Sequence, residues 1–256
     1  MTTTAAFTRV APSTAVQRIG RVVRLHFANP WTTITLPWII LGVIFLANLA
    51  IWEIIFIAAT NAGDKRDIAD GMQYSGSSFY IFVYMAIVAI QAINITFPFA
   101  LGYGVTRRDY YLGTAVNFVI LAAIYSAGLT VLGIIERATN GWGIGGRMFT
   151  AVYFGDNWLQ NFYIFFVGML FFFFAGAAFG AVFVRWKGTG LTFVFIGLGA
   201  LVIGVMALIG LTGSWAAVGS FFASAGLVGS LSLSLLITAV AGVAGFLVLR
   251  RATPRG

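Results

Sequence analysis

Long apolar stretches alternate with short polar segments along almost the whole chain. A helix needs about 20 apolar residues to cross the hydrocarbon core of a bilayer. Stretches of that length predict membrane spans at residues 34–57, 78–101, 112–135, 161–184, 190–211 and 222–249. The predicted fold class is therefore all-α, a polytopic membrane protein whose six transmembrane helices form a single domain over residues 30–256.

Two further segments are expected before the first span. Residues 1–13 are small and polar and predict a mobile tail. Over residues 14–29 apolar side chains recur at helical spacing, while Arg18, Arg21 and Arg24 line another face. This pattern predicts an amphipathic helix in the lipid headgroup layer, with a short cytoplasmic helix packed on protein as the alternative. Pro30 ends the helix, because the residue before a proline avoids the α conformation.

The basic residues gather in clusters that are separated by two spans each. Because two spans return the chain to the same side, all clusters and both termini are expected on one side of the membrane. By the positive-inside rule that side is the cytoplasm. We therefore expect an integral protein of a bacterial cytoplasmic membrane. The clusters comprise Arg9 to Arg24, Arg107 and Arg108, Arg185 and Lys187, and Arg250 to Arg255.

Composition agrees with this picture and narrows the possible partners. With 60% apolar and only 9% charged residues, the chain is no soluble globular domain, which usually carries about 25% charged residues. The net charge of +8 comes from the predicted cytoplasmic segments, which hold eleven basic residues and a single acid. This excess suits anionic lipid headgroups of the bilayer. No nucleic-acid partner is expected, because the basic residues do not form one continuous face.

The usual residues of catalytic and nucleotide sites are missing from the sequence. There is no cysteine, and neither Lys65 nor Lys187 follows a glycine, so a phosphate-binding P-loop is absent. Asp64, Asp67 and Asp70 recur every three residues, but Lys65 and Arg66 lie between them, which favours a solvated outer loop over a cation site. We expect no enzyme activity, cofactor or metal in this chain.

A few polar residues interrupt the predicted spans. In hydrocarbon such groups need partners, so they are expected to face the interior of the helix bundle. They would either line a translocation path or form hydrogen bonds between helices. These candidates are Asn48, Glu53, Gln91, Asn94 and Asn117.

Small residues recur at every fourth position in the last predicted span. Such a row lets helix backbones approach closely and predicts a helix-packing seam, whose partner is a helix of the same chain or of another copy. The turn before this span, residues 212–221, is either plain or shallowly re-entrant. The row comprises Gly226, Ser230, Ser234, Thr238 and Gly242.

The turn after the second span carries the most distinctive sequence. Pro98 is expected to kink the end of that span, because proline removes a backbone hydrogen bond. Thr106 is suited to cap the next helix, and Asp109 at the third helical position imitates a capping box. Two arginines and two tyrosines follow the cap, which are residue types common in protein contacts. A plain cytoplasmic turn with stop-transfer arginines is the alternative.

The run FPFALGYGVTRRDYYLGT at residues 97–114 resembles the loop between the second and third spans of type-2 ABC transporter permeases, the membrane subunits of ATP-driven exporters. The six spans, the N-terminal helix and the lack of a fused nucleotide-binding domain are similar too, whereas the Glu-Ala-Ala signature of importer permeases is absent. The resemblance implies a separately encoded ABC ATPase, a second permease copy (a homodimer or a close paralogue) and outward transport of an amphiphilic drug, peptide or lipid. It also implies that a coupling loop contacts the ATPase through Gly104, Thr106, Arg107, Arg108, Asp109 and Tyr110.

Other functions remain possible on sequence grounds. A membrane scaffold or assembly factor would use the small-residue seam and have no ATPase partner. An intramembrane enzyme would depend on Glu53, the single acid within a predicted span. A secondary transporter would need coupling-ion sites near the membrane midplane, which the uncharged centres of the spans do not provide.

Overall fold

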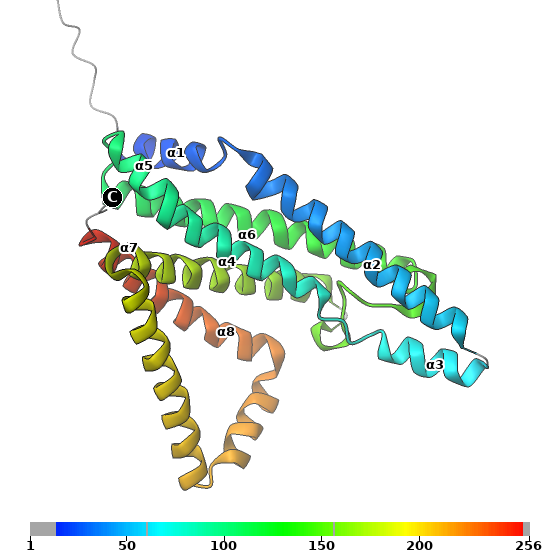
Figure 1. Ribbon diagram of the computed structural model, residues 1–256. Helices are drawn as coiled ribbons and strands as arrows, with labels where there is room; N and C mark the ends of the chain where they lie inside the picture. Colours follow the sequence, from blue (N-terminus) through cyan, green and yellow to red (C-terminus); the bar gives the residue numbers. More distant parts are fainter. Residues whose placement is uncertain (1–13, 60, 156, 253–256) are drawn as a thin grey trace, which may run out of the picture.

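The computed structural model describes residues 14–59, 61–155 and 157–252, and every regular element within them is helical (Figure 1). Some of these helices are long and apolar enough to cross a membrane, so the architecture is that of an α-helical integral membrane protein. The five candidates are Trp31–Ala58, Ser77–Gly102, Arg107–Ala138, Trp158–Leu211 and Trp215–Arg250. The predicted mobile tail at residues 1–13 lies outside the described residues.

Helix α7 (Trp158–Leu211) contains two of the predicted spans. Its 54 residues would measure about 81 Å if straight, against a hydrocarbon thickness of about 30 Å. The helix breaks at Lys187, where the backbone adopts φ 57° and ψ −148°. Figure 1 shows the first limb running along the bundle and the second limb leaving it. The predicted span at residues 190–211 is therefore helical but turns away from the bundle.

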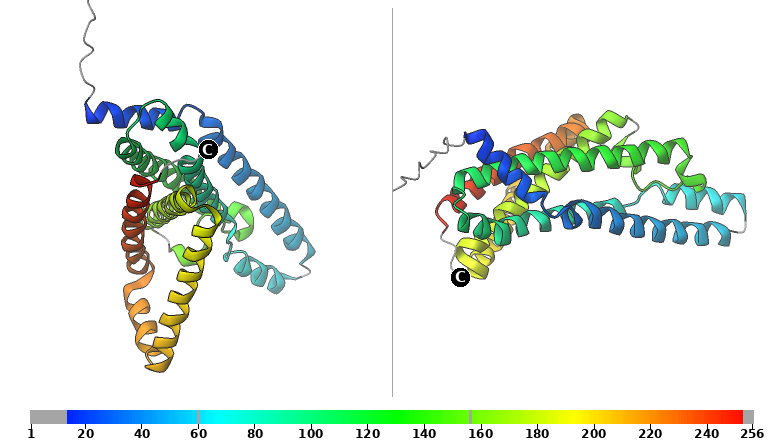
Figure 2. Two further views of the ribbon diagram at one scale, coloured as in Figure 1. Left: turned by 60° about the vertical axis from the view of Figure 1, so that its left-hand side comes forward. Right: turned by 90° about the horizontal axis from the view of Figure 1, so that it is seen from above.

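Helix α8 (Trp215–Arg250) differs from the prediction at its beginning. It starts at Trp215, so the predicted turn over residues 212–221 is wrong in extent, and the chain reverses within 212–214. The helix breaks again at Gly226, with φ 63° and ψ −176°. Residues 188–225 consequently form a hairpin that projects from the bundle (Figures 1 and 2). Gly226 is not in one continuous helical row with the small residues that follow it, which corrects the predicted seam.

The bundle itself consists of α2 (Leu36–Ala58), α4 (Tyr80–Gln91), α5 (Phe97–Gly102), α6 (Arg107–Ala138) and the parts of α7 and α8 that lie beside them (Figure 2). Aromatic side chains fill much of the contact between α6 and α7. The ring of Phe118 on α6 stacks on that of Phe173 on α7, with centroids 4.8 Å apart, and both side chains are buried. These contacts create a packed core along the first limb of α7.

Two five-residue π turns lie just before prolines and share a local sequence. The turn Trp31–Thr35 precedes Pro37, and the turn Ala92–Thr96 precedes Pro98. In both, Ile-Thr and an apolar residue come directly before the proline. A proline cannot donate the backbone hydrogen bond of a regular helix, and a wider turn adapts the helix to that loss. At Pro98 the helix continues as α5 after this π turn, where the sequence predicted a kink.

Tyrosine hydroxyls satisfy backbone carbonyls at these turns. Tyr125 on α6 donates a hydrogen bond of 2.7 Å to the carbonyl of Thr33, the group that an amide at residue 37 would bind in a regular helix. Tyr84 donates to the carbonyl of Thr32 at 2.9 Å, and Tyr110 donates to that of Ala92 at 2.5 Å. Hydrogen bonds from neighbouring helices are the usual way in which membrane proteins tolerate proline within a span.

The basic clusters meet at one end of the bundle. Figure 1 shows α1 (Ala15–His26), α5, the bend of α7 and the last turn of α8 together at the left, far from α3 (Ala62–Gly71) at the right. We call these the basic end and the acidic end, because α3 carries Asp64, Asp67 and Asp70. The segment predicted as a solvated outer loop is thus partly helical. Arg9 and Arg255 lie outside the described residues.

Glu136 organises the loop at the acidic end. Its carboxylate is fully buried at the end of α6 and accepts hydrogen bonds from the backbone amides of Met148 at 2.7 Å, Phe149 at 3.1 Å and Thr150 at 2.7 Å. The Thr150 hydroxyl at 2.6 Å and the Trp142 indole at 3.0 Å complete the set. A buried charge is tolerated when such donors surround it. The loop between α6 and α7 therefore folds around one carboxylate.

Replacing Tyr125 by Phe tests whether its hydroxyl substitutes for the amide missing at Pro37. We expect a loss of about 1 kcal/mol in the free energy of unfolding in mixed micelles, and a smaller loss in a Pro37→Ala background, where an amide can reach the Thr33 carbonyl. Tyr163→Phe, which removes a hydrogen bond to Ser232, is the control and should cost the same in both backgrounds. Equal losses for Tyr125→Phe in both backgrounds would contradict the substitution.

Glu136→Gln should release the loop, because an amide accepts fewer hydrogen bonds and presents its own donors to those of the loop. The expected cost is about 3 kcal/mol of stability, together with faster tryptic cleavage after Arg147. Asp67→Asn, an exposed change on α3, serves as the matched control and should alter neither quantity. Unchanged cleavage of the Glu136 variant would show that the loop does not depend on this carboxylate.

Candidate functional site

The turn between α5 and α6 projects at the basic end of the bundle. Helix α5 ends with hydrogen bonds from the amide of Gly104 to the carbonyl of Leu101 at 3.0 Å and from Val105 to Ala100 at 3.2 Å. Gly104 adopts φ 79°, a left-handed conformation that glycine takes without steric cost. This residue therefore ends one helix and turns the chain towards the next, leaving residues 102–104 exposed.

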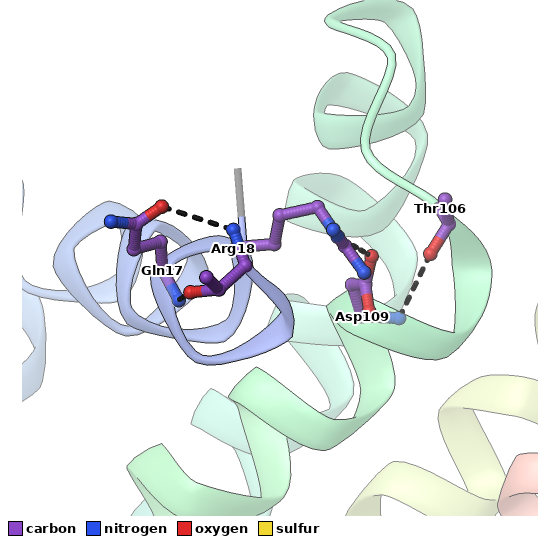
Figure 3. Close-up of polar contacts among 5 residues, drawn as sticks. Gln17, Arg18, Thr106 and Asp109 are labelled. Atoms are coloured by element: carbon purple, nitrogen blue, oxygen red, sulfur yellow. Dashed lines mark hydrogen bonds and ion pairs between the residues drawn. The ribbon is translucent and has the colours of Figure 1, made fainter. Parts of the chain in front are cut away.

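The first turn of α6 is capped and tied to α1. Thr106 accepts a hydrogen bond of 3.1 Å from the amide of Asp109, as an N-cap residue does. The buried Asp109 carboxylate also forms an ion pair of 2.7 Å with Arg18 on α1. Figure 3 shows this guanidinium reaching across from α1 to Asp109. The residue before Arg18, Gln17, forms a capping box with Thr14 at the start of α1. The acid predicted to face an ATPase is thus held inside the chain.

Two more predicted coupling residues are also engaged within the chain. Tyr110 is fully buried, and its hydroxyl bonds to the carbonyl of Ala92. Arg107 donates a hydrogen bond of 2.9 Å to the carbonyl of Arg250, the last residue of α8. These contacts join α6 to the second span and to α8. They hold the turn in place and do not leave these two polar groups free for an outside partner.

The exposed part of the site is smaller than the sequence indicated. Of the six predicted coupling residues, Gly104, Thr106 and Arg108 are exposed. The most exposed large side chain is Tyr103, at 75%, whose ring packs on Phe99 with centroids 4.8 Å apart. Sequence reasoning quoted Tyr103 within the motif but did not select it, although its place between two glycines signals a protruding turn.

Helix α1 lies against α6 rather than only on a lipid surface. Val22 is buried, and a methyl group on Gly113 of α6 would lie 2.5 Å from its side chain. At the end of α1, Nε2 of His26 and Oγ1 of Thr114 are hydrogen-bonded at 2.9 Å. Val16 remains 78% exposed at the other end of the helix. Packing on protein, one of the two alternatives for this segment, therefore accounts for its central face.

Comparisons of the chain with protein families, with curated proteins and with solved structures found no match. Functional inference therefore rests on the geometry of the site and on the resemblance of residues 97–114. Among the described residues, no group of three or more histidine, cysteine or acidic side chains is close enough to hold a metal ion. The site at the basic end offers a contact surface built on a rigid base.

The predicted intramembrane polar residues do not converge on a single path. Asn48 accepts a hydrogen bond of 2.9 Å from Ser77 and donates one to its own helix, so it acts as an interhelical contact. Glu53 is half-buried near the acidic end of α2, and Asn94 is half-buried in the π turn of the second span. The side chain of Gln91 is exposed, which corrects the expectation that it faces the bundle interior.

Asn117 and Gln91 both line a polar cavity of about 180 Å³ beside α1. His26, Asn29 and Thr33 line it too, and Oδ1 of the buried Asn117 has no hydrogen-bond partner among the described residues. The cavity is large enough for several water molecules, which would satisfy that oxygen. His26, for which the sequence predicted no role, thus borders a polar cavity between α1, α6 and the second span.

The small-residue row on α8 packs within the chain over part of its length. Thr238 is buried, and the carbonyl of Gly242 accepts a hydrogen bond of 2.5 Å from Tyr111 on α6. The hydroxyl groups of the row donate hydrogen bonds to backbone carbonyls of their own helix. Ser230 donates to Gly226, Ser234 to Leu231 and Thr238 to Ser234. The end of the row nearest the basic end is a contact with α6 and α7 of the same chain.

Acidification is expected to weaken the packing of α1 on α6 through protonation of His26. Burial lowers the pKa of this imidazole from 6.5 to about 4, so the folded protein keeps it neutral where an undocked helix would bind a proton. Stability is therefore expected to fall as the pH drops from 6.5 towards 4 and to lose nothing further from this group below that. Thermal unfolding midpoints of the wild type and of His26→Gln across this range provide the measurement. The variant should show a flatter profile, and identical profiles would contradict the role of His26.

Proposed function

We propose that this chain is the membrane subunit of an ATP-driven ABC exporter and that the turn between α5 and α6 is its contact with a separate ATPase subunit. The observation that carries the proposal is the position of the resembling segment, which forms a protruding turn on a fixed base at the basic end. Helix α6 begins directly after this turn and runs the length of the bundle (Figure 1).

The proposed topology has six spans with both termini in the cytoplasm. The break at Lys187 divides α7 into two limbs, each long enough to cross the membrane, which brings the count from five helices to six. The basic residues at one end and the aspartates of α3 at the other support an orientation with the basic end inside. The site is then on the side of the membrane where ATP is available.

We assign different roles to the residues of the predicted coupling loop. Tyr103 and Gly104 at the tip would contact the ATPase, because an exposed aromatic ring is a common centre of protein interfaces. Arg107, Asp109 and Tyr110 are positioning residues that transmit movement of the tip. ATP binding by the partner would push the turn, and the Arg18–Asp109 ion pair would make α1 follow α6.

A second copy of the chain, or a close paralogue, would complete the transport path. The projecting hairpin at residues 188–225 is apolar and largely exposed, which suits contact with another membrane helix or with lipid. The path would carry an amphiphilic drug, peptide or lipid outward. The molecular mass of the purified complex reports the number of permease copies.

The test is co-expression of the tagged chain with a P-loop ATPase that lacks membrane segments and is encoded by a neighbouring reading frame. Tyr103→Ala is expected to weaken the association more than about tenfold, as truncation of a central interface residue does. The matched control is Tyr74→Ala, which removes a tyrosine that is 69% exposed between α3 and the second span, away from the proposed contact. Recovery of ATPase activity with the purified chain is measured for both variants.

Equal recovery with Tyr103→Ala and with the wild type would contradict the assignment of the contact. If the chain binds no P-loop ATPase, the result would favour the scaffold function, which needs no such partner. Substrate-stimulated ATP hydrolysis by the wild-type complex in proteoliposomes would distinguish an exporter from a complex that merely assembles.

A further inference from the structure

An apolar groove of about 570 Å³ runs between α6, α7 and α8 and reaches the basic end of the bundle. Its volume is within the range of about 300–1,000 Å³ that is typical of sites for small molecules. Along α8 it extends from Leu235 to Phe246, which corresponds to about 17 Å of helix. One leaflet contributes about 15 Å of hydrocarbon, half of the bilayer core. The groove therefore matches the depth of a single leaflet.

The polar groups of the groove wall are used within the chain, with one exception. The Tyr111 hydroxyl donates to the carbonyl of Gly242, and the Thr238 hydroxyl donates to that of Ser234. Arg108 is exposed, and in the described part of the chain its guanidinium makes no hydrogen bond. It lies in the first turn of α6 and is the one charged residue among those that line the groove, so the apolar groove ends beside a guanidinium.

The position of that cation indicates what the groove holds. The neighbouring Arg107 bonds to the carbonyl of Arg250, and Tyr111 lies against Phe246 with ring centroids 5.4 Å apart. These contacts place the start of α6 beside the last turns of α8, at the basic end. There, a guanidinium at headgroup depth can bind a phosphate while the apolar walls cover an acyl chain.

A second copy of this chain fits the groove less well. In a parallel assembly its acidic residues would have to approach Arg108 at the basic end. The nearest acid, Asp109, is buried and paired with Arg18. The other acids among the described residues lie in or beside the segments at the acidic end, namely Glu53, Asp64, Asp67, Asp70 and Glu136. The described residues of a parallel copy would therefore bring no exposed side-chain carboxylate to Arg108, whereas a phospholipid brings a phosphate.

We propose that this groove is a binding site for one anionic phospholipid of the leaflet at the basic end, with its phosphate on Arg108 and an acyl chain between α6 and α8. The site lies on the surface of one chain and needs neither the ATPase nor a transported substrate. Bound lipid would contact the first turn of α6, which also carries the turn proposed to meet the ATPase.

The experiment measures lipid binding to the purified chain alone by native mass spectrometry in detergent. The probes are phosphatidylglycerol, phosphatidylcholine with the same acyl chains, and glycerophosphoglycerol, which has the headgroup without chains. We expect one phosphatidylglycerol to bind more tightly than phosphatidylcholine, and glycerophosphoglycerol not to be retained. Tight binding of the chain-free headgroup would show a simple phosphate site and overturn the lipid assignment.

Two variants and one control locate the site. Arg108→Gln should weaken phosphatidylglycerol binding about fivefold and leave phosphatidylcholine unchanged, because one arginine near a membrane surface contributes about that factor. Ala239→Trp, a change on the exposed rim of the groove, should reduce the binding of both lipids by filling the space for the chain. Arg185→Gln removes an exposed arginine at the bend of α7, outside the groove, and should have no effect.

Each alternative has its own outcome. Equal phosphatidylglycerol affinity for Arg108→Gln and the wild type would overturn the proposal. The proposal would also be overturned if the wild type were a dimer and Ala239→Trp converted it to monomers without changing lipid binding. That result would show that a second copy covers the groove. No ATPase is present in the lipid-binding experiment, so its result is independent of the proposed exporter function. Likewise, a lack of ATPase association in the co-expression experiment would not change the lipid-binding result.

Discussion

The structure depends on one requirement, that every backbone amide and carbonyl within the bilayer finds a partner inside the protein. The bundle meets it with helices, and where Pro37 and Pro98 interrupt the helical hydrogen bonds it forms π turns, joined at Pro37 by the Tyr125 hydroxyl on the carbonyl of Thr33. Tyr125 on α6 thus fastens the first span, and Tyr110, in the first turn of α6, fastens the second. These hydrogen bonds also hold α6, whose first turn carries part of the candidate site. The hydrogen bond of Tyr125 therefore both compensates for Pro37 and holds α6 against the first span.

Charge organises the two ends differently. At the acidic end a single carboxylate collects neutral donors from its own loop, which makes Glu136 a folding centre with no free acceptor capacity aimed outward. At the basic end arginines connect separate elements, α1 to α6 through Arg18 and α6 to α8 through Arg107. In the first turn of α6, Arg107 and Asp109 are both engaged within the chain. The exposed large side chains of the turn between α5 and α6 and of the first turn of α6 are Tyr103 and Arg108.

The helical spans, their approximate limits and the cap at Thr106 could be predicted from the sequence because they depend on local composition. The positions of 34–57 and 78–101 agree with helices found at Trp31–Ala58 and Ser77–Gly102. Pairings between distant residues could not be predicted. Nothing local distinguishes Asp109 as the partner of Arg18, or Glu136 as a buried anchor rather than a loop acid. The break at Gly226 depends on a single left-handed residue, which a periodicity of small side chains does not reveal.

The bend of α7 has a consequence for how the hairpin meets its surroundings. Lys187 holds a conformation that is nearly confined to glycine and costs about 1–3 kcal/mol elsewhere. Gly188, the next residue, is helical in this structure, but as a glycine it could adopt the conformation of Lys187 without that cost. The bend of α7 could therefore be placed at either of two adjacent residues, Lys187 or Gly188. Moving the bend by one residue rotates the following helix by about 100°, so a different stripe of side chains would face the bundle. A single peptide unit thereby selects which surface the hairpin presents.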